Sequence, residues 1–477
     1  MRTVVLALLC AALCGCVEIE NAPINVPVTP GQQPFPGNSP PADETTAVGV
    51  AFSGGGTRAA AFSFGVLNQL AAMPANDETG TLLDRVDFVS GVSGGSITAA
   101  YFGLRGRDAL LDFREAFLIQ DVEAHLHTSP YDPMNFFRAY AGGVNDRRGM
   151  QAWLDDHLFH GAKFSALTGP GKPAIWINAS DIYNNTPFVF DPEDFAPLCS
   201  DLSKLPLSEG VAASAAVPIA FAPIVMQSFP KACAYTPPAW ATAALADPNA
   251  PQNLRAYAQA LLNYNNPAAM NYVKLLDGGL VDNFGLAALT LRRQEADPKT
   301  IAPMSAEQAV HLRRLMFVVV DAGQSTDNSW VKTVAGPTGP VIAMAAADTA
   351  LNVAKLQSYD LFHDEMDHWQ KRIVAWRCAL SRDDVIRLRG SDAGWDCRDL
   401  HFYVARVSFS LLDPVRAEEL SVMPTTLSLP AASVDLLIRG GEDALLRAPE
   451  FQDFLRAGEK KVSDLQPVSS STGLPRG

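Results

Sequence analysis

The sequence predicts an α/β fold in which a largely parallel sheet carries helices on both faces. Two features of the sequence lead to this expectation. Short apolar runs typical of buried strands alternate with longer helical patterns, and each of the first two runs is followed by a short glycine-containing turn and then a helix. The expected strands cover residues 47–52, 86–89, 174–179, 272–277, 315–322 and 401–407, and the expected helices include residues 59–73, 97–104, 342–376 and 431–446. At 477 residues the chain can bury one large core with insertions, or two to three ordinary domains.

Composition and charge narrow the choice of partners. The chain is 48% hydrophobic and 18% charged, which is typical of a globular protein. Its net charge of −14 makes nucleic acid an unsuitable partner. Anionic lipid headgroups would also repel this surface, so attachment to a membrane requires something other than electrostatics.

An N-terminal segment provides such an attachment. Arg2 precedes an apolar run over residues 4–13, which has the length of a signal-peptide core and is too short to span a bilayer. Leu13-Cys14-Gly15-Cys16 resembles the bacterial lipobox, so we expect a signal peptide at residues 1–15 and a lipid on Cys16. Val17 stands where aspartate would signal inner-membrane retention, and this favours an exported lipoprotein of the outer membrane. Plain secretion is the alternative.

A proline-rich segment follows the expected anchor. Residues 17–46 contain seven prolines and lack helical or strand periodicity. We therefore expect residues 16–46 to form an extended, solvated tether with a reach of roughly 30 Å. The catalytic domain is expected at residues 47–460 and a disordered tail at residues 461–477.

The stretch around Ser93 carries the first chemical signal. Gly91-Val92-Ser93-Gly94-Gly95 contains G-x-S-x-G between an expected strand and an expected helix. This is the setting of a nucleophile elbow, in which Gly91 and Gly95 leave room for the sharp bend that exposes the serine hydroxyl. An ordinary Gly/Ser turn is the competing interpretation.

A glycine loop follows the first strand. Gly54, Gly55 and Gly56 precede Arg58 at the start of an expected helix, where backbone N–H groups and the helix dipole would stabilise an oxyanion. A dinucleotide-binding fingerprint is the alternative, but no acidic residue ends a second strand about twenty residues later.

The third signal is Asp277, which ends an apolar strand and is followed by Gly278 and Gly279. An apolar surround would raise the pKa of this carboxylate and make it a useful base for Ser93. The other interpretation is an aspartate that caps a turn.

Taken together, these three segments resemble the patatin-like phospholipases. Ala213-Ser214-Ala215-Ala216-Val217-Pro218 adds to the resemblance, which covers about residues 47–285 and, more weakly, residues 429–455. It implies a lipid acyl hydrolase that cleaves phospholipid or another lipid ester through a Ser93–Asp277 dyad, without cofactor or metal. The loop at residues 54–58 would then be the oxyanion hole. Small departures occur at Ala59 and Gly285, where the family often has glycine and proline.

Two other functions remain open at this point. The first is an α/β-hydrolase esterase whose triad uses a later histidine, such as His311 or His401. The second is a catalytically inactive lipid-anchored binding protein or scaffold that keeps the fold. The eight histidines form no recognisable metal pattern.

Four cysteines remain after the signal region, and export favours two disulfides. Three connectivities are possible, of which Cys199–Cys233 with Cys378–Cys397 is the most local; free buried thiols are the alternative.

Two excursions interrupt the catalytic pattern. Residues 222–271 are expected to form short helices beside the active-site mouth, as a candidate lid. Residues 324–397 contain a long amphipathic helix whose apolar face is expected to join the core.

Overall fold

The computed structural model describes residues 19–29, 31, 35, 38, 44–75, 80–129, 131–296, 300–324, 334 and 336–464. The expected signal peptide at residues 1–15, the expected lipid site at Cys16 and most of the predicted tail lie outside the described residues.

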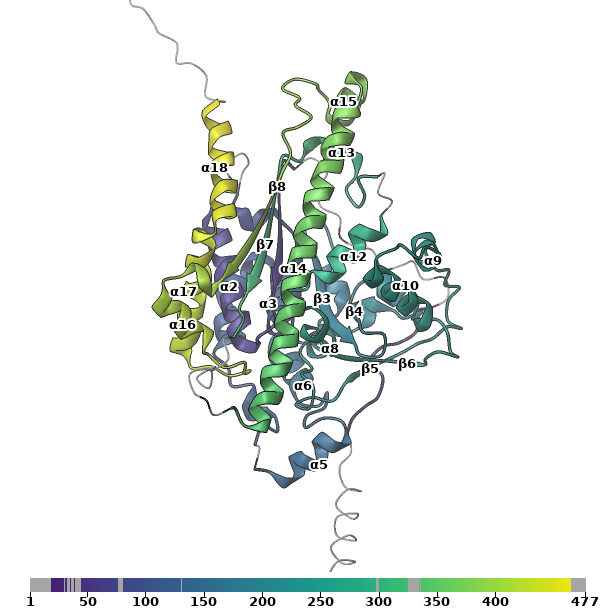
Figure 1. The fold of residues 1–477 in the computed structure, drawn as a ribbon, viewed down its shortest axis with the longest axis vertical. Helices are drawn as coiled ribbons and strands as arrows, with labels where there is room; N and C mark the ends of the chain where they lie inside the picture. Colours follow the sequence, from purple (N-terminus) through teal and green to yellow (C-terminus); the bar gives the residue numbers. More distant parts are fainter. Residues whose placement is uncertain are drawn as a thin grey trace, which may run out of the picture.

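An eight-stranded sheet forms the centre of the molecule, in the order β5-β6-β3-β2-β1-β7-β8, with β4 paired to β3 (Figure 1). The strands are β1 (Thr46–Phe52), β2 (Val86–Val92), β3 (Ala174–Asp181), β4 (Thr186–Val189), β5 (Ile224–Gln227), β6 (Tyr272–Asp277), β7 (Arg314–Asp321) and β8 (His401–Ser408). The run from β3 through β2, β1 and β7 to β8 is parallel, whereas β4, β5 and β6 pair in the antiparallel direction. The prediction of a largely parallel α/β sheet is therefore confirmed.

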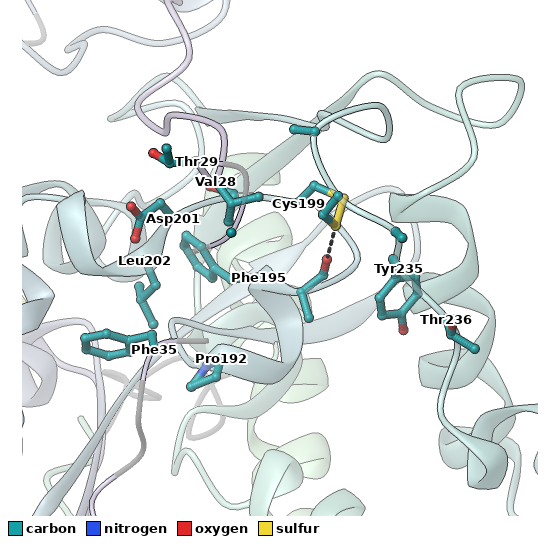
Figure 2. A pocket seen from close by; sticks show the side chains of 16 residues that line it. Val28, Thr29, Phe35, Pro192, Phe195, Cys199, Asp201, Leu202, Tyr235 and Thr236 are labelled. Carbon is teal, nitrogen blue, oxygen red and sulfur yellow. Dashed lines mark hydrogen bonds between the residues drawn. A yellow bond between two sulfur atoms is a disulfide. The ribbon is translucent and has the colours of Figure 1, made fainter. Parts of the chain in front are cut away.

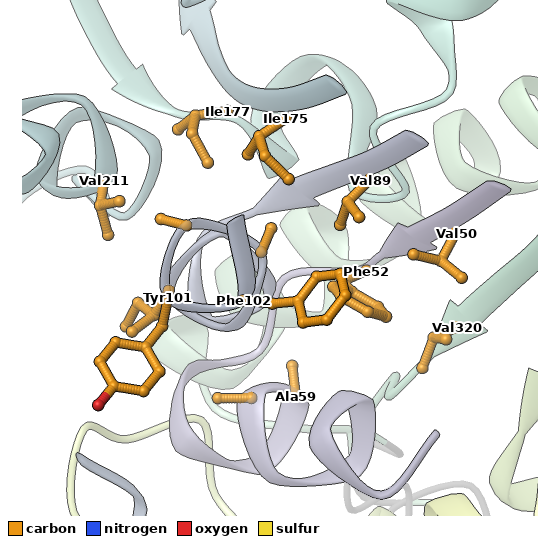
Figure 3. Close-up of a cluster of buried hydrophobic side chains, with 14 of the residues drawn as sticks. Val50, Phe52, Ala59, Val89, Tyr101, Phe102, Ile175, Ile177, Val211 and Val320 are labelled. Carbon is orange, nitrogen blue, oxygen red and sulfur yellow. The ribbon is translucent and has the colours of Figure 1, made fainter. Parts of the chain in front are cut away.

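Helices cover both faces of this sheet because its central strands are apolar on both sides. On one face, α2 (Gly56–Ala72), α3 (Gly94–Arg105) and α17 (Ala431–Arg447) enclose the larger core, into which Phe52 and Val320 project (Figure 3). On the other face, Phe317 and Val319 pack in a second core under α12 (Ala287–Glu295) and α14 (Gly339–Ala379).

The long helix α14 was expected from the amphipathic pattern at residues 342–376, and its bounds are Gly339–Ala379. Its buried stripe consists of Phe362, Met366, Trp369 and Ile373, which recur at helical spacing in the second core. This part of the apolar face joins the core, as expected. The short helix α15 (Arg382–Arg389) follows, and a disulfide joins Cys378 to Cys397.

Eleven further α-helices complete the described part of the fold. They are α4 (Ala109–Phe113), α5 (Pro133–Ala141), α6 (Met150–Leu154), α7 (Pro192–Phe195), α8 (Leu207–Ser214), α9 (Ala239–Ala246), α10 (Gln252–Tyr264), α11 (Gly279–Asp282), α13 (Ala306–His311), α16 (Pro414–Ser421) and α18 (Pro449–Asp464). Helix α18 continues to Asp464, so the first residues of the segment predicted as a disordered tail are helical. No helix in the described part of the chain is both long enough and apolar enough to cross a bilayer.

The tether prediction is wrong for residues 19–29, which lie against the domain. Asn25 is only 6% exposed; its amide group donates to Ser200 Oγ at 2.9 Å and to Gln227 O at 2.8 Å, and its Oδ1 accepts from Gln227 N at 2.7 Å. The Ile24 amide also donates to Val225 O at 3.0 Å, so the segment runs along the edge strand β5. An extended proline-containing segment can pair with an exposed strand edge, and composition alone does not reveal this.

Cys199 and Cys233 form the other disulfide, which lies beside this N-terminal segment. Together with Val28, Thr29 and Phe35 they line a cavity of about 420 Å³ (Figure 2). Residues 222–271, expected as short helices only, also contain the strand β5. Helix α10 in this excursion is fixed by the buried side chains of Tyr257 and Tyr264.

Candidate active site

Ser93 occupies a sharp turn between the end of β2 at Val92 and the start of α3 at Gly94. Its φ of 51° and ψ of −122° place a non-glycine residue in a region that costs about 1–3 kcal/mol. Two close approaches require glycine here. A Cβ on Gly91 would lie 2.7 Å from Ser96 Cα, and one on Gly95 would lie 2.6 Å from Ser53 O. The G-x-S-x-G stretch therefore forms a strained strand-to-helix elbow.

Hydrogen bonds from neighbouring elements fix this turn. The Ser93 amide donates to Ser214 Oγ at 2.9 Å, and the Ser214 hydroxyl donates to Asn178 O at 2.6 Å. Ser214 ends α8, and Asn178 lies in β3. Ser96 closes the turn from the other side, because its amide donates to Ser93 O at 2.9 Å. The nucleophile candidate is thus held at its backbone, while its hydroxyl remains available.

The strand that carries Asp277 runs in a direction that the sequence did not predict. The last pair between β2 and β3 is Val92 with Asn178, and the next residue of β3, Ala179, pairs with Asp277 in the antiparallel direction. Strand β6 therefore approaches from beyond the carboxyl end of the parallel strands and ends level with Ser93. The Asp277 amide donates to Ala216 O at 2.8 Å, which ties the end of β6 to the segment after α8.

The surroundings of the Asp277 carboxylate favour a base. The side chain is 9% exposed, and burial raises its pKa from 3.8 to about 6. A hydrogen bond from the Gly279 amide, at 2.8 Å, and the nearby Ser93 hydroxyl partly oppose this rise in the pKa. The residues that the sequence singled out as nucleophile and base therefore lie together, with the Ser93 hydroxyl close enough to Asp277 to lower the pKa of its carboxyl.

The glycine loop lies directly beside this pair. A Cβ on Gly54 would lie 3.2 Å from Ser93 Cβ, and one on Gly94 would lie 2.8 Å from Gly56 N. Helices α2 and α3 therefore begin side by side at Gly56 and Gly94, and both helix dipoles contribute positive potential there.

The four residues predicted as an oxyanion hole differ in what they can donate. The Gly54 amide is already bonded to Asn283 O at 3.1 Å. The Arg58 guanidinium donates to Ala322 O at 3.0 Å and to Met423 O at 2.6 Å, which fixes the loop. The amides of Gly55 and Gly56 form no hydrogen bond to any residue that the structure describes, so these two can bind an oxyanion.

Two residues of the site were missed as functional candidates. Ser214 belongs to the Ala-Ser-x-Ala-x-Pro segment, so its presence was noted but its bond to the Ser93 amide was not predicted. Asn283 follows the Asp-Gly-Gly segment, and its Oδ1 lies 2.6 Å from the position of a Cβ on Gly279. Its carbonyl accepts the Gly54 amide, so Asn283 joins the glycine loop to the Asp277 segment.

The histidines proposed for a triad lie at the other end of the sheet. His401 begins β8 and pairs with Arg314 at the start of β7, and His311 ends α13 just before that strand. Eight strand residues span roughly 25 Å. Ser93 follows the opposite, carboxyl end of the sheet, so neither histidine can reach it in this fold.

Two polar contacts hold helix α14 against the carboxyl end of the parallel strands, the end at which Ser93 lies. Lys355 Nζ lies 3.1 Å from Asp321 Oδ1, and Ser358 Oγ donates to Asp282 Oδ1 at 3.0 Å. Burial would raise the pKa of Asp321, but Lys355 and Arg406 together hold it below its ordinary value. An ionised Asp321 therefore anchors α14 beside the loop that carries Arg58.

Comparison with known proteins agrees with this geometry. No curated protein matches the chain. A family model described as patatin-like phospholipase matches residues 50–290, which include the glycine loop, the serine elbow and the Asp-Gly-Gly segment. The chain belongs to the patatin-like phospholipase family.

Proposed function

We propose that this protein is a serine hydrolase that cleaves carboxylic ester bonds of lipids through Ser93 and Asp277. Family membership supports lipid acyl hydrolysis in general. The observation that carries the finer proposal is the place of the Ser93 hydroxyl beside the buried Asp277 carboxylate, where two helices begin.

In the first half of the reaction, Ser93 Oγ attacks the ester carbonyl carbon while its proton passes to Asp277. The carbonyl oxygen becomes an oxyanion that accepts hydrogen bonds from the amides of Gly55 and Gly56. Collapse of this intermediate breaks the carbon–oxygen bond, and the leaving alcohol takes the proton from Asp277. An acyl group then remains on Ser93.

In the second half, Asp277 accepts a proton from a water molecule that attacks the acyl carbon. The oxyanion re-forms in the same place, and its collapse releases the fatty acid and returns the proton to Ser93. A carboxylate with an ordinary pKa near 3.9 would be a weak base for both steps. The raised pKa of Asp277, about 6, supports the assignment.

The test is the release of fatty acid by the purified protein from phosphatidylcholine and, separately, from triacylglycerol, identified by mass spectrometry. We expect release from at least one class, and its loss in Ser93→Ala. Ser391→Ala, which removes an exposed hydroxyl after α15, is the matched control and should keep full activity. Release that survives Ser93→Ala in a folded protein would refute the proposal.

We also propose that the chain is an exported lipoprotein held at the outer membrane by a lipid on Cys16. The short apolar core, the Leu-Cys-Gly-Cys stretch and Val17 support this. Mass spectrometry of the mature N-terminus should find a lipidated cysteine; an unmodified residue or cleavage elsewhere would contradict the assignment.

A further inference from the structure

Exposed aromatic side chains gather on α5 and on the turn that precedes it. Tyr131, Phe136 and Tyr140 are 91%, 73% and 85% exposed. Phe136 and Tyr140 are separated by one helical turn, so both project from the same side of α5. A group of aromatic rings that are mostly exposed to solvent indicates a contact surface, because these rings contribute little to the core.

This helix is tied to the candidate active site. The chain leaving α5 pairs with the segment after α8: the Val144 amide donates to Ile219 O at 2.9 Å, and the Ala222 amide donates to Asn145 O at 2.7 Å. Ile219 is itself 72% exposed, and Ala216, three residues earlier, accepts the Asp277 amide. Backbone hydrogen bonds therefore hold the exposed aromatic residues and Ile219 next to the segment that binds the Asp277 amide, and Tyr131, Phe136, Tyr140 and Ile219 are called here the apolar face.

The position of the N-terminal segment indicates what this face meets. Ile19 lines a pocket together with Met134 and Arg138 of α5, and the Glu20 amide donates to Asp146 Oδ2 at 2.9 Å. Cys16 is three residues from Ile19, and three extended residues reach at most about 10 Å. A lipid on Cys16 would thus enter its membrane next to α5. In Figure 1, α5 marks one end of the molecule, while α15 and α18 mark the other.

The charge of the protein restricts the kind of membrane. A net charge of −14 opposes association of the protein as a whole with anionic headgroups. Tyrosine and phenylalanine at the headgroup level can instead bind through apolar contact and the amphipathic tyrosine ring. Such contact suits a zwitterionic phospholipid surface.

We infer that the apolar face of α5 and Ile219 docks onto a zwitterionic phospholipid bilayer and so places the Ser93–Asp277 site against the lipid surface. The orientation of the protein on the bilayer rests on the proposed lipid anchor. The proposed hydrolase activity is needed only for the consequence, that the Ser93–Asp277 site meets its substrate there. A second copy of the chain is the competing occupant.

Hydrogen–deuterium exchange tests the docking without requiring turnover. The full processed chain carrying Ser93→Ala is measured with and without phosphatidylcholine vesicles. Residues 131–142 and 217–222 should exchange several-fold more slowly with vesicles, whereas residues 106–113, at the other end of the sheet, should not change. Unchanged exchange in α5, or slowing that depends on protein concentration without vesicles, would overturn the inference.

Variants of the active enzyme add a second measurement. Phe136→Ser and Tyr140→Ser should each lower hydrolysis of phosphatidylcholine vesicles by about tenfold, from the apolar area that leaves the bilayer. Hydrolysis of a soluble short-chain ester should stay the same. Leu111→Ser is the matched control, because Leu111 is 79% exposed on α4, away from this face. Equal loss on both substrates, or no loss on vesicles, would contradict docking.

The two proposals can fail separately. Protection of α5 by vesicles without any ester hydrolysis would keep the docking face and reject the hydrolase. Hydrolysis of vesicle phospholipid without protection of α5 would keep the hydrolase and reject the docking face.

Discussion

Asp277→Asn should abolish ester hydrolysis and, at the same time, make the folded protein more stable at neutral pH. The carboxylate is buried, and its pKa rises from 3.8 to about 6 on folding. A difference of about two pKa units corresponds to about 3 kcal/mol of unfavourable free energy for keeping the ionised group in the folded protein. The asparagine side chain is neutral at every pH, so the variant does not have this unfavourable free energy.

The sign of the effect depends on pH. Below about pH 4 the carboxyl is protonated in both the folded and the unfolded chain, so burial of charge contributes nothing. Between pH 4 and 6 the unfolded chain loses this proton first, so the wild-type free energy of unfolding falls as pH rises. Above about pH 6 the carboxyl is ionised in both states, and the free energy of unfolding no longer falls because of this group. The stability of Asp277→Asn relative to wild type should therefore increase by about 3 kcal/mol from pH 4 to pH 8.

Urea unfolding of both proteins across this pH range, followed by tryptophan fluorescence, measures the difference directly. Asp364→Asn removes an exposed carboxylate on α14 and is the matched control, for which we expect a difference near zero at all pH values. A difference between Asp277→Asn and wild type that stays constant, or that shrinks as pH rises, would refute the reasoning about burial.

The remaining predictions concern activity and packing. Turnover of a soluble ester should rise with pH and level off above about 6, because Asp277 must lose its proton to act as a base; a pH–rate profile without a step near this value would contradict the assignment. Gly54→Ala should lower kcat by tenfold or more, because the added Cβ would overlap Asn283 Oδ1 and lie 3.2 Å from Ser93 Cβ; unchanged kcat would argue against this close approach. Asn25→Ala should lower the free energy of unfolding by about 2 kcal/mol, since buried partners lose their hydrogen bonds; no loss would show that residues 19–29 are not docked.

The sequence predicted six of the eight strands, all but β4 and β5, and the three segments of the site because their signals are local. A strand that ends in Gly-x-Ser-x-Gly, or in Asp-Gly-Gly, can be identified without knowing what lies beside it. The long helix α14 was also predictable, because its apolar residues recur with helical spacing along one chain segment.

Other features depended on contacts between distant segments. The alternation of residues in β6 is the same for either strand direction, so its antiparallel pairing with β3 could not be predicted. The hydrogen bond from the Gly54 amide to Asn283 O, which keeps this amide from binding an oxyanion, joins residues far apart in sequence. The docking of residues 19–29 likewise relies on the buried hydrogen bonds of Asn25, which a proline-rich composition does not reveal.

The Ser93–Asp277 mechanism is tested most directly by measuring ester hydrolysis by Ser93→Ala, Asp277→Asn and the double variant, beside His311→Ala and His401→Ala. Each single change in the dyad should lower kcat by several orders of magnitude, and the double variant should be only slightly slower than either, because the two residues act as one unit. Both histidine variants should keep wild-type turnover. Retention of most activity by folded Asp277→Asn, or its loss in either histidine variant, would contradict the Ser93–Asp277 mechanism.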